Sequence, residues 1–590
     1  FLFRVRALAG AFRGPSGSAR PRRFAGRRRW PRARGRKEEP ARVMAACFEP
    51  ARIARLFSAS GMGRIRWSEL ADVLRCTDAS VFTDANIARL FDGYGRRRGE
   101  SVQVADFLQW LAAGRSRPLA PTPALRGLGA SRERRHLILN FDINKTIVMM
   151  DSATGKSMED IANHVLALSA WGSARASAAA GAPPAAAWTC ESSSPSVERP
   201  EPGLVSYAEF LEAQFPGQGN KERREELWHR FTHAGEPGEA MRPHCNSFLA
   251  ALKLPSAVVG SQAARDAGLH GEEVFILPAF FELLLQLKRS GRSFSLVFRT
   301  FGTDLHEVST EFNAFCEGRH PLFPGAVFDG RDGGVDYRIN LSDPSAFGTF
   351  FRSSLSGEGD ALVYGTLRQP KPHEGGVDFY EGSEEFAGLR IVSGGPQAMY
   401  RDLRRRTGKP GTMALRDYFP FWRAQGMGSD PSKLNGGKLM VIDPRPSSNV
   451  HEIFFDDNIY YARPRIVDVR HARLPTKVLS MRWLAPCHLV RAEPLESVTD
   501  PQYFIRHVER LSDAYERRFT ACARLRDLCQ QALRTSAFSR ARAQSMSRGP
   551  DEYDPWVVVR NEERRHSKAA SFAEVEEEAP GPWSAKIMGS

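Results

Sequence analysis

The sequence lacks paired cysteines, histidine clusters and long apolar runs. Its eight Cys are scattered over 590 residues without a Cys-x-x-Cys pair, and its 14 His form no His-Glu-x-x-His motif. We therefore expect neither a disulfide framework nor a structural zinc, and we predict a reduced, intracellular protein of the cytoplasm. No run approaches the ~18 apolar residues of a membrane helix, so no membrane span is expected.

Acidic residues are nearly absent from residues 1–43. Thirteen Arg and one Lys against two Glu give this segment a net charge of +12, out of +15 for the whole chain. The rest of the chain is close to neutral and gives no charge argument for a nucleic-acid surface. We favour a basic disordered segment or an upstream stretch that the mature protein lacks. The alternatives are an organelle-targeting peptide and an arm with a weak role in binding nucleic acid or anionic lipid.

The length and the 42% hydrophobic content predict more than one domain. Residues 44–115 carry apolar positions at helical spacing and predict a helix pair. Residues 116–134 are rich in Pro, Gly and Ser and predict a linker. An α/β domain is expected over residues 135–534, and a polar, disordered tail over 535–590.

The helix pair resembles an EF-hand pair. Gly63 stands at the sharp-turn position of the first loop, Ile65 at its central apolar position and Glu69 at its last ligand position, while Val102 is central in the second loop. The positions where calcium needs oxygen ligands instead hold Ser58, Ser60 and Met62 in the first loop and Gly95, Arg97 and Gly99 in the second. The ligand count therefore argues against calcium binding. We expect the pair to dock on the main domain or on a protein partner.

The main domain is organised around residues 136–146, His-Leu-Ile-Leu-Asn-Phe-Asp-Ile-Asn-Lys-Thr. The apolar run Leu137–Phe141 predicts a buried strand of a parallel sheet. Asp142 follows where this strand ends, at the carboxyl edge of the sheet, and open α/β folds bind their ligands at that edge.

Asp142 and Thr146 resemble the first motif of the haloacid dehalogenase (HAD) superfamily, Asp-x-Asp-x-Thr after a hydrophobic strand. The resemblance implies that Asp142 is a nucleophile that becomes an aspartyl phosphate, and that Thr146 helps to bind the substrate. Asn144 departs from the motif, because phosphatases of the superfamily use a second Asp there as general acid and base. An amide has no proton to exchange at neutral pH.

Three later segments follow the order of the superfamily's other motifs. Residues 293–300 predict a second buried strand, and the resemblance implies that Thr300 at its end binds phosphoryl oxygens. Lys438 is our choice for the lysine that balances the phosphoryl charge, with Lys433 as the alternative. The apolar strand over residues 450–455 is followed by Asp456 and Asp457. The resemblance implies that Asp142, the backbone carbonyl of Asn144, and Asp456 or Asp457 hold Mg²⁺, which prefers such oxygen ligands.

The predicted fold is α/β: a Rossmann-like doubly wound parallel sheet with cap insertions, preceded by a small all-α EF-hand-like domain. Long insertions are expected at about residues 150–275 and 303–437. Within them, residues 170–200 predict a disordered loop, Tyr207–Phe231 a helix, and Met413–Trp422 a helix-like segment. The first insertion stands where the superfamily places a cap over the active site.

The leading hypothesis is a magnesium-dependent HAD-like phosphohydrolase or phosphotransferase that acts on a phosphorylated substrate and is impaired by Asn144. Acid–base help is worth about 10²–10⁴ in rate, so its loss slows turnover or traps the phosphoenzyme. One alternative is a non-catalytic HAD-like interaction protein that keeps the pocket for binding. Another is a calcium-responsive EF-hand protein. Whether the protein is an enzyme stays open at this point.

Overall fold

The computed structural model describes residues 63–534 apart from short gaps. The residues outside the description are 1–62, 78–80, 95–100, 114–134, 150–155, 175–187, 355–356, 358, 373, 382–385, 387, 427–435, 444–448, 460–465, 473, 479–480 and 535–590. Several predictions fall on these residues: the basic segment 1–43, the linker 116–134, the tail 535–590, Ser58, Ser60, Met62, Gly95, Arg97, Gly99 and Lys433.

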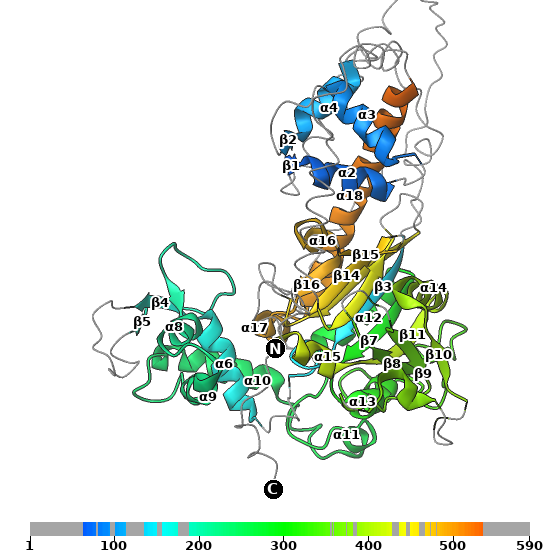
Figure 1. Ribbon diagram of the computed structural model, residues 1–590. Coiled ribbons are helices and arrows are strands. Elements are labelled where there is room, and N and C mark those ends of the chain that lie inside the picture. Colours follow the sequence, from blue (N-terminus) through cyan, green and yellow to red (C-terminus); the bar gives the residue numbers. More distant parts are fainter. Residues whose placement is uncertain are drawn as a thin grey trace, which may run out of the picture. The chain divides into compact units, whose positions relative to one another are not determined.

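A large, mostly parallel sheet lies at the centre of the α/β unit (Figure 1). Its strands, in the order in which they lie in the sheet, are β10 (Arg390–Val392), β9 (Ala361–Tyr364), β8 (Phe347–Phe351), β11 (Gly411–Asp417), β7 (Phe294–Thr300), β3 (His136–Asp142), β13 (Val450–Asp456) and β16 (Leu489–Arg491). From β8 to β16 all neighbours are parallel. The exception is β9, which pairs antiparallel with both β8 and β10.

The sheet is covered on both faces, which explains the continuous apolar runs of β3 and β7, in which every residue is buried. One face packs against α12 (Pro278–Arg289), α13 (Leu305–Cys316) and the first part of α18 (Tyr503–Arg534). The other face packs against α14 (Gly395–Thr407) and β12 (Lys438–Ile442).

β12 belongs to a second sheet of three strands, β12-β14-β15, with β14 at Val467–His471 and β15 at Leu474–Val478. The layering is therefore mixed α/β and compatible with a Rossmann-like fold. It differs from the expected doubly wound form, because a small sheet shares the second face with α14.

The strand predicted over residues 293–300 is present as β7, and α12 precedes it. α12 begins with Pro278 at its first position, where proline's missing N–H costs no hydrogen bond. The chain turns at Gly291, whose φ of 62° lies in the left-handed region. β7 follows directly.

The interval between β3 and α12 builds a unit with its own core around Trp188, Tyr207 and Phe231. It contains α6 (Met158–Ser169), α8 (Tyr207–Gln214), α9 (Lys221–His229), α10 (Arg242–Leu252), α11 (Gln262–Asp266) and the antiparallel strands β5 (Trp188–Cys190), β4 (Trp171–Ala174) and β6 (Val205–Ser206). α17 (Pro494–Thr499) contributes to the same cluster. This interval is where we expected the first insertion.

Two predictions inside this interval were wrong. The loop expected over residues 170–200 is interrupted by β4 and β5, which pair with each other, while residues 175–187 lie outside the described part of the chain. The single helix expected over Tyr207–Phe231 is two helices, because α8 ends at Gln214 and the chain continues with Pro216 and Gly217 before α9. Gly217 has a φ of 85°, which no helix contains.

The second predicted insertion, 303–437, also needs correction. It supplies β8, β9, β10 and β11 to the central sheet, so most of the interval is core structure. The helix-like segment Met413–Trp422 is instead the strand β11 followed by the short helix α15 (Phe419–Ala424). A short apolar run occurs in buried helices and in buried strands, and its periodicity does not distinguish a helix from a strand over so few residues.

The region predicted as the helix pair holds three helices among the described residues: α2 (Trp67–Thr77), α3 (Asp84–Tyr94) and α4 (Val104–Ala113). It is not purely helical, since β1 (Arg64–Arg66) and β2 (Ser101–Gln103) pair with Ile65 opposite Val102. Glu69, at the last ligand position of the EF-hand-like loop, accepts a hydrogen bond from the backbone N–H of Arg66 at 2.9 Å. The Glu69 carboxylate therefore bonds the backbone at the start of its own helix, α2.

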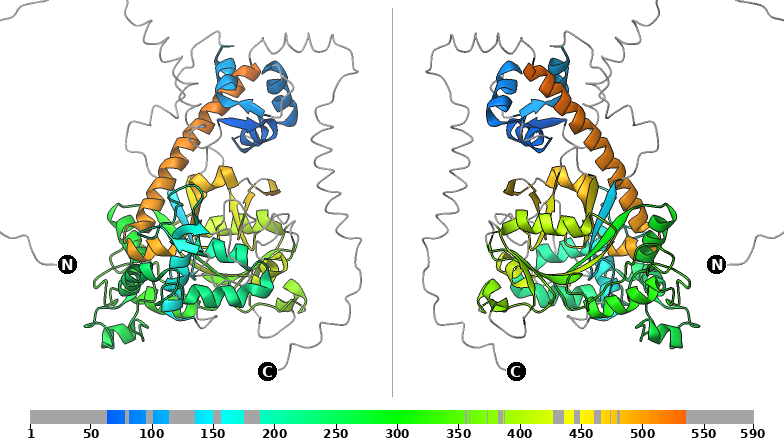
Figure 2. Two further views of the ribbon diagram at one scale, coloured as in Figure 1. Left: turned by 90° about the vertical axis from the view of Figure 1, so that its left-hand side faces the viewer. Right: turned by 90° about the vertical axis from the view of Figure 1, so that its right-hand side faces the viewer.

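The apolar side of these helices packs against the far part of α18, through Leu525, Leu528 and Cys529 (Figure 2). The expected docking on the main domain therefore takes the form of contact with its long terminal helix. Although α18 has 32 residues, neither it nor any other helix among the described residues is long and apolar enough to span a membrane.

Candidate active site

The carboxyl end of β3 lies at the point where the strand order of the central sheet reverses. The chain leaves β3 for β7 on one side and returns much later to β13 on the other side. At such a point the connections diverge and leave a crevice, which is where open α/β sheets bind ligands. Asp142 is the last residue of β3 and Asp456 the last of β13, so two carboxylates stand at this edge.

Lys438 joins these two carboxylates. It is the first residue of β12, and its Nζ lies 2.5 Å from Asp142 Oδ1 and 2.7 Å from Asp456 Oδ2. All three side chains are buried, Lys438 and Asp456 completely. Lys438, our choice from the sequence, therefore lies between the two carboxylates, while the alternative Lys433 lies outside the described residues.

The three charged groups shift one another's pKa values. Burial raises the pKa of the Asp142 carboxyl to about 7, with Lys438 opposing this rise and Asp456 adding to it. Burial alone would lower the pKa of Lys438, but Asp142 and Asp456 together raise it above its ordinary value. Lys438 is therefore a fixed positive charge, whereas Asp142 exchanges its proton near neutral pH.

Thr146 ties the loop after β3 to the end of β13. Its hydroxyl donates to Asp142 Oδ2 at 3.3 Å and accepts from the backbone N–H of Asp457 at 3.2 Å. Thr146 is fully buried, so in this structure its hydroxyl orients the two acidic residues. The substrate contact that the resemblance implied for Thr146 stays a prediction.

The loop itself has one unusual residue. Lys145 has a φ of 58°, the only positive φ of a non-glycine residue in the described part of the chain. The left-handed region costs an L-residue about 1–2 kcal/mol. This cost is accepted immediately beside Asn144 and Thr146, as is common where a site constrains the backbone.

Asp142, Asp456 and Asp457 fit a divalent cation. Each offers a carboxylate oxygen, and these oxygens lie within 4.8 Å of one another. With all three carboxyls ionised, their charge against Lys438 would be a net −2, and Lys145 offsets part of it at Asp457. Burial, together with Asp456 and Asp142, raises the pKa of Asp457 well above its ordinary value. A hard divalent cation on these oxygens would relieve that repulsion.

Thr300 and Asn144 meet around Gly302. Thr300 is buried, and its Oγ1 accepts from the backbone N–H of Gly302 at 2.8 Å. A Cβ on Gly302 would lie 3.3 Å from Thr300 Oγ1, 3.3 Å from Asn144 Nδ2 and 2.3 Å from Asp304 Oδ2. A side chain at this position would displace the Asp304 carboxylate, and the three polar groups approach the same backbone.

Asn144 contributes only its amide to this arrangement. Its Nδ2 donates to Asp304 Oδ2 at 2.9 Å, while its Oδ1 is buried with no hydrogen-bond partner among the described residues. Asp304 stands at the start of α13, where its side chain makes no capping hydrogen bond. The sequence did offer a signal for Asp304, because this residue follows shortly after Thr300 at the end of a predicted buried strand.

The structure thus brings five predicted residues into one connected group: Asp142, Thr146, Lys438, Asp456 and Asp457. Asn144 and Thr300 form a second group with Asp304. Besides Asp304, sequence reasoning missed Asn458, whose backbone N–H donates to Asp456 Oδ1 at 2.9 Å and whose side chain donates to Asp457 Oδ1 at 2.8 Å. A comparison of the chain with known proteins finds no matching family model, no similar curated protein and no similar solved structure.

Proposed function

We propose that the chain is a magnesium-dependent phosphohydrolase or phosphotransferase of the HAD-like kind, with a Rossmann-like core, that works through an aspartyl phosphate. The observation that carries the proposal is the buried contact of Lys438 with both Asp142 and Asp456 at the reversal point of the sheet. A lysine and two carboxylates are costly to bury, and a structural role alone would be served as well by apolar side chains.

In this proposal the Asp142 carboxylate attacks the phosphorus atom in line with the leaving oxygen. The new bond joins Asp142 to phosphorus, and the bond from phosphorus to the leaving oxygen breaks. Lys438 and the hydroxyl of Thr300 stabilise the charge on the transferring group, which is the main task in phosphoryl transfer. Water then attacks the same phosphorus and returns Asp142 to a carboxylate.

Magnesium would be held by Asp142, Asp456 and Asp457, together with the backbone carbonyl of Asn144. When bound, the ion supplies positive charge to the phosphoryl oxygens. Lys438 pairs with two of these carboxylates but neutralises only one negative charge, so the site keeps negative charge to attract the ion. Thr146 orients the Asp142 carboxylate, because its hydroxyl bonds both Asp142 and the backbone N–H of Asp457.

Proton transfer is the step that Asn144 cannot perform. Asp304 is the carboxylate in hydrogen-bond contact with the Asn144 amide, and it lies beside the Thr300 hydroxyl over Gly302. We assign it the exchange of one proton: Asp304 gives a proton to the leaving oxygen and later accepts one from the attacking water. This assignment gives the substituted site an acid–base group from a neighbouring helix.

A second candidate function is favoured by Asn144 alone. Its Oδ1 is buried and its Nδ2 donates to Asp304, so the Asn144 side chain is a neutral amide that takes no part in proton transfer. On this reading the protein binds a phosphorylated ligand or magnesium without turnover and acts as an interaction protein. The helix pair then provides further surface, although its apolar side is already covered by α18.

The test is hydrolysis of an aryl phosphate by the full chain with magnesium. Wild type is compared with Asp142→Asn, Asp304→Asn and Asn144→Asp. Turnover that Asp142→Asn abolishes supports the aspartyl nucleophile. A turnover rate of Asp304→Asn that is about 10²–10⁴ times lower than that of wild type supports the acid–base role of Asp304.

The remaining outcomes separate the two functions. An inactive wild type that gains turnover on Asn144→Asp alone indicates an intact scaffold that binds without turnover. Wild-type activity that survives Asp142→Asn contradicts the proposed mechanism. Unchanged activity in Asp304→Asn, with Asp142→Asn inactive, removes only the assignment of Asp304.

A further inference from the structure

A cavity of about 600 Å³ opens at the edge of the central sheet opposite to Asp142. It lies at the amino ends of β7 and β11, where Ser295 and Thr412 line it, and it reaches the last turn of α14. Cavities of roughly 300–1,000 Å³ are the usual size of small-molecule sites. Nothing in the proposed reaction uses this cavity.

Three arginines in its lining share one carboxylate. Arg390, Arg405 and Arg406 all pair with Asp402, which is 2% exposed; Arg405 Nη2 lies 2.5 Å and Arg406 Nε 3.2 Å from its oxygens. Among the described residues no second acidic side chain pairs with any of the three. Three positive charges against one negative charge leave a surplus of two.

These arginines are held in place rather than dispersed over the surface. The guanidinium groups of Arg390 and Arg406 lie 5.2 and 4.4 Å from the ring centre of Tyr364. Tyr364 is buried, and its hydroxyl donates to Asp402 at 2.8 Å. Ring and carboxylate thus restrict the guanidinium groups before any ligand arrives, which lowers the entropic cost of binding.

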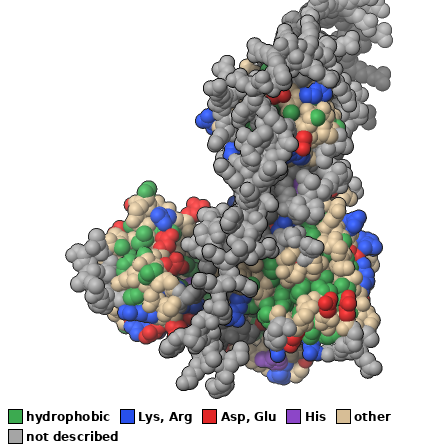
Figure 3. All heavy atoms as spheres, viewed as in Figure 1, with side chains coloured by type: hydrophobic (Ala, Val, Ile, Leu, Met, Phe, Trp, Pro, Cys, Tyr) green, Lys and Arg blue, Asp and Glu red, His purple; other side chains and the backbone are tan. Residues whose placement is uncertain are grey.

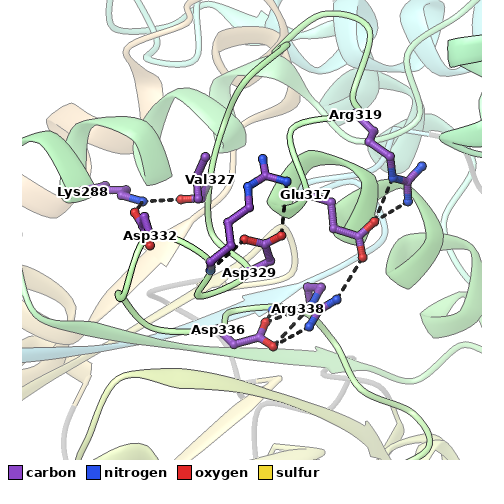
Figure 4. Close-up of polar contacts among 9 residues, drawn as sticks. Lys288, Glu317, Arg319, Val327, Asp329, Asp332, Asp336 and Arg338 are labelled. Carbon is purple, nitrogen blue, oxygen red and sulfur yellow. Dashed lines mark hydrogen bonds and ion pairs between the residues drawn. The ribbon is translucent and has the colours of Figure 1, made fainter.

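Asp336 in the lining, and Glu317 that shares Arg338 with it, do not cancel this surplus (Figure 4). Arg338 pairs with both Asp336 and Glu317, and Glu317 also pairs with Arg319, so this group carries two charges of each sign. Figure 4 shows these side chains directed toward one another.

The two other charged residues in the lining, Lys409 and Asp343, balance each other in number. Counting the cavity and its supporting residues therefore leaves the surplus of two positive charges on the arginine side. Figure 3 shows Lys and Arg side chains gathered on the right-hand side of the view, where α14 lies in Figure 1.

We propose that this cavity binds the dianionic phosphate group of a small molecule. A phosphate monoester carries a charge of about −1.5 to −2 at pH 7, which matches the surplus, and guanidinium groups bind its oxygens in pairs. The volume leaves room for an organic part beside apolar Leu296 and Met413. The proposal does not rest on the proposed reaction, since it concerns the opposite edge of the sheet.

The test is isothermal titration of the full chain, free of divalent cations, with inorganic phosphate and with glycerol phosphate. The key variant is Arg405→Ala with Lys409→Ala, since both side chains are exposed and their loss spares the fold. Arg401→Ala is the matched control, an exposed arginine of the same helix outside the lining. We expect about tenfold or weaker binding in the double variant and no change in the control.

Two comparisons sharpen the result. Equal affinity for both probes would identify the phosphate anion alone as sufficient, whereas tighter binding of the ester would show that the organic part contributes; either outcome supports the site. Binding should also weaken near pH 5, where the monoester loses its second charge (pKa about 6). No binding of either probe at about 10 mM, or equal weakening by Arg401→Ala, would overturn the proposal.

Discussion

Replacing Lys438 by Met removes the positive charge between Asp142 and Asp456 while nearly keeping the volume of the side chain. The two carboxylates then face each other in a buried site, with Asp457 beside them. Breaking a buried ion pair on one side costs about 3–5 kcal/mol, and here two partners are left unpaired. We therefore expect a loss of this size in the free energy of unfolding at about pH 8.

The loss should depend on pH in a defined direction. Asp142 has a pKa of about 7 with Lys438 present, against an ordinary value of 3.8, and removing Lys438 raises it further. The folded variant then binds more protons than the unfolded chain from about pH 4 upward, so its stability falls as the pH rises. The deficit relative to wild type should be largest at about pH 8 and smallest at about pH 5.

Urea denaturation at both pH values measures this difference, with Lys371→Met as the control because the Lys371 side chain is 72% exposed. Magnesium should restore more stability to Lys438→Met than to wild type, since the ion replaces the missing charge. Lys438→Met combined with Asp456→Asn should recover part of the loss. A variant as stable as wild type at pH 8, or with the same deficit at both pH values, would refute the reasoning.

Three further changes test other parts of the structure. Burial raises the pKa of Glu452 to about 7 from 4.5, so Glu452→Gln should stabilise the protein by about 2–3 kcal/mol above pH 7 and by little near pH 4; urea denaturation across this range would show no trend if the carboxyl is normally ionised. Lys145→Gly should be about 1 kcal/mol more stable than Lys145→Ala, because both remove the charge and only Ala keeps a Cβ at a φ of 58°; equal thermal midpoints would contradict this. Leu525→Ala, at a fully buried position, should cost about 2–5 kcal/mol and raise hydrogen exchange in residues 67–113, and unchanged exchange there would show that α18 does not hold the helix pair.

The sequence alone determined the elements that carry the candidate site. Apolar runs ending in Asp142, Thr300 and Asp456 predicted three buried strands, and β3, β7 and β13 are these strands. Such strands can be predicted from the sequence because a strand buried on both faces is a continuous apolar run without alternating polar residues. The substitution at Asn144 was also visible, since it concerns the identity of one side chain.

Only the tertiary structure decided which of these residues meet. Lys438 is 296 positions from Asp142, and no local pattern states that β12 leaves the central sheet and places its first residue between two strand ends. The contact of Asp304 with Asn144 likewise depends on how α13 begins after β7. The role of residues 303–437 in the sheet was hidden for the same reason, because strand pairing joins segments that are distant in sequence, and short apolar runs leave helix and strand equally open.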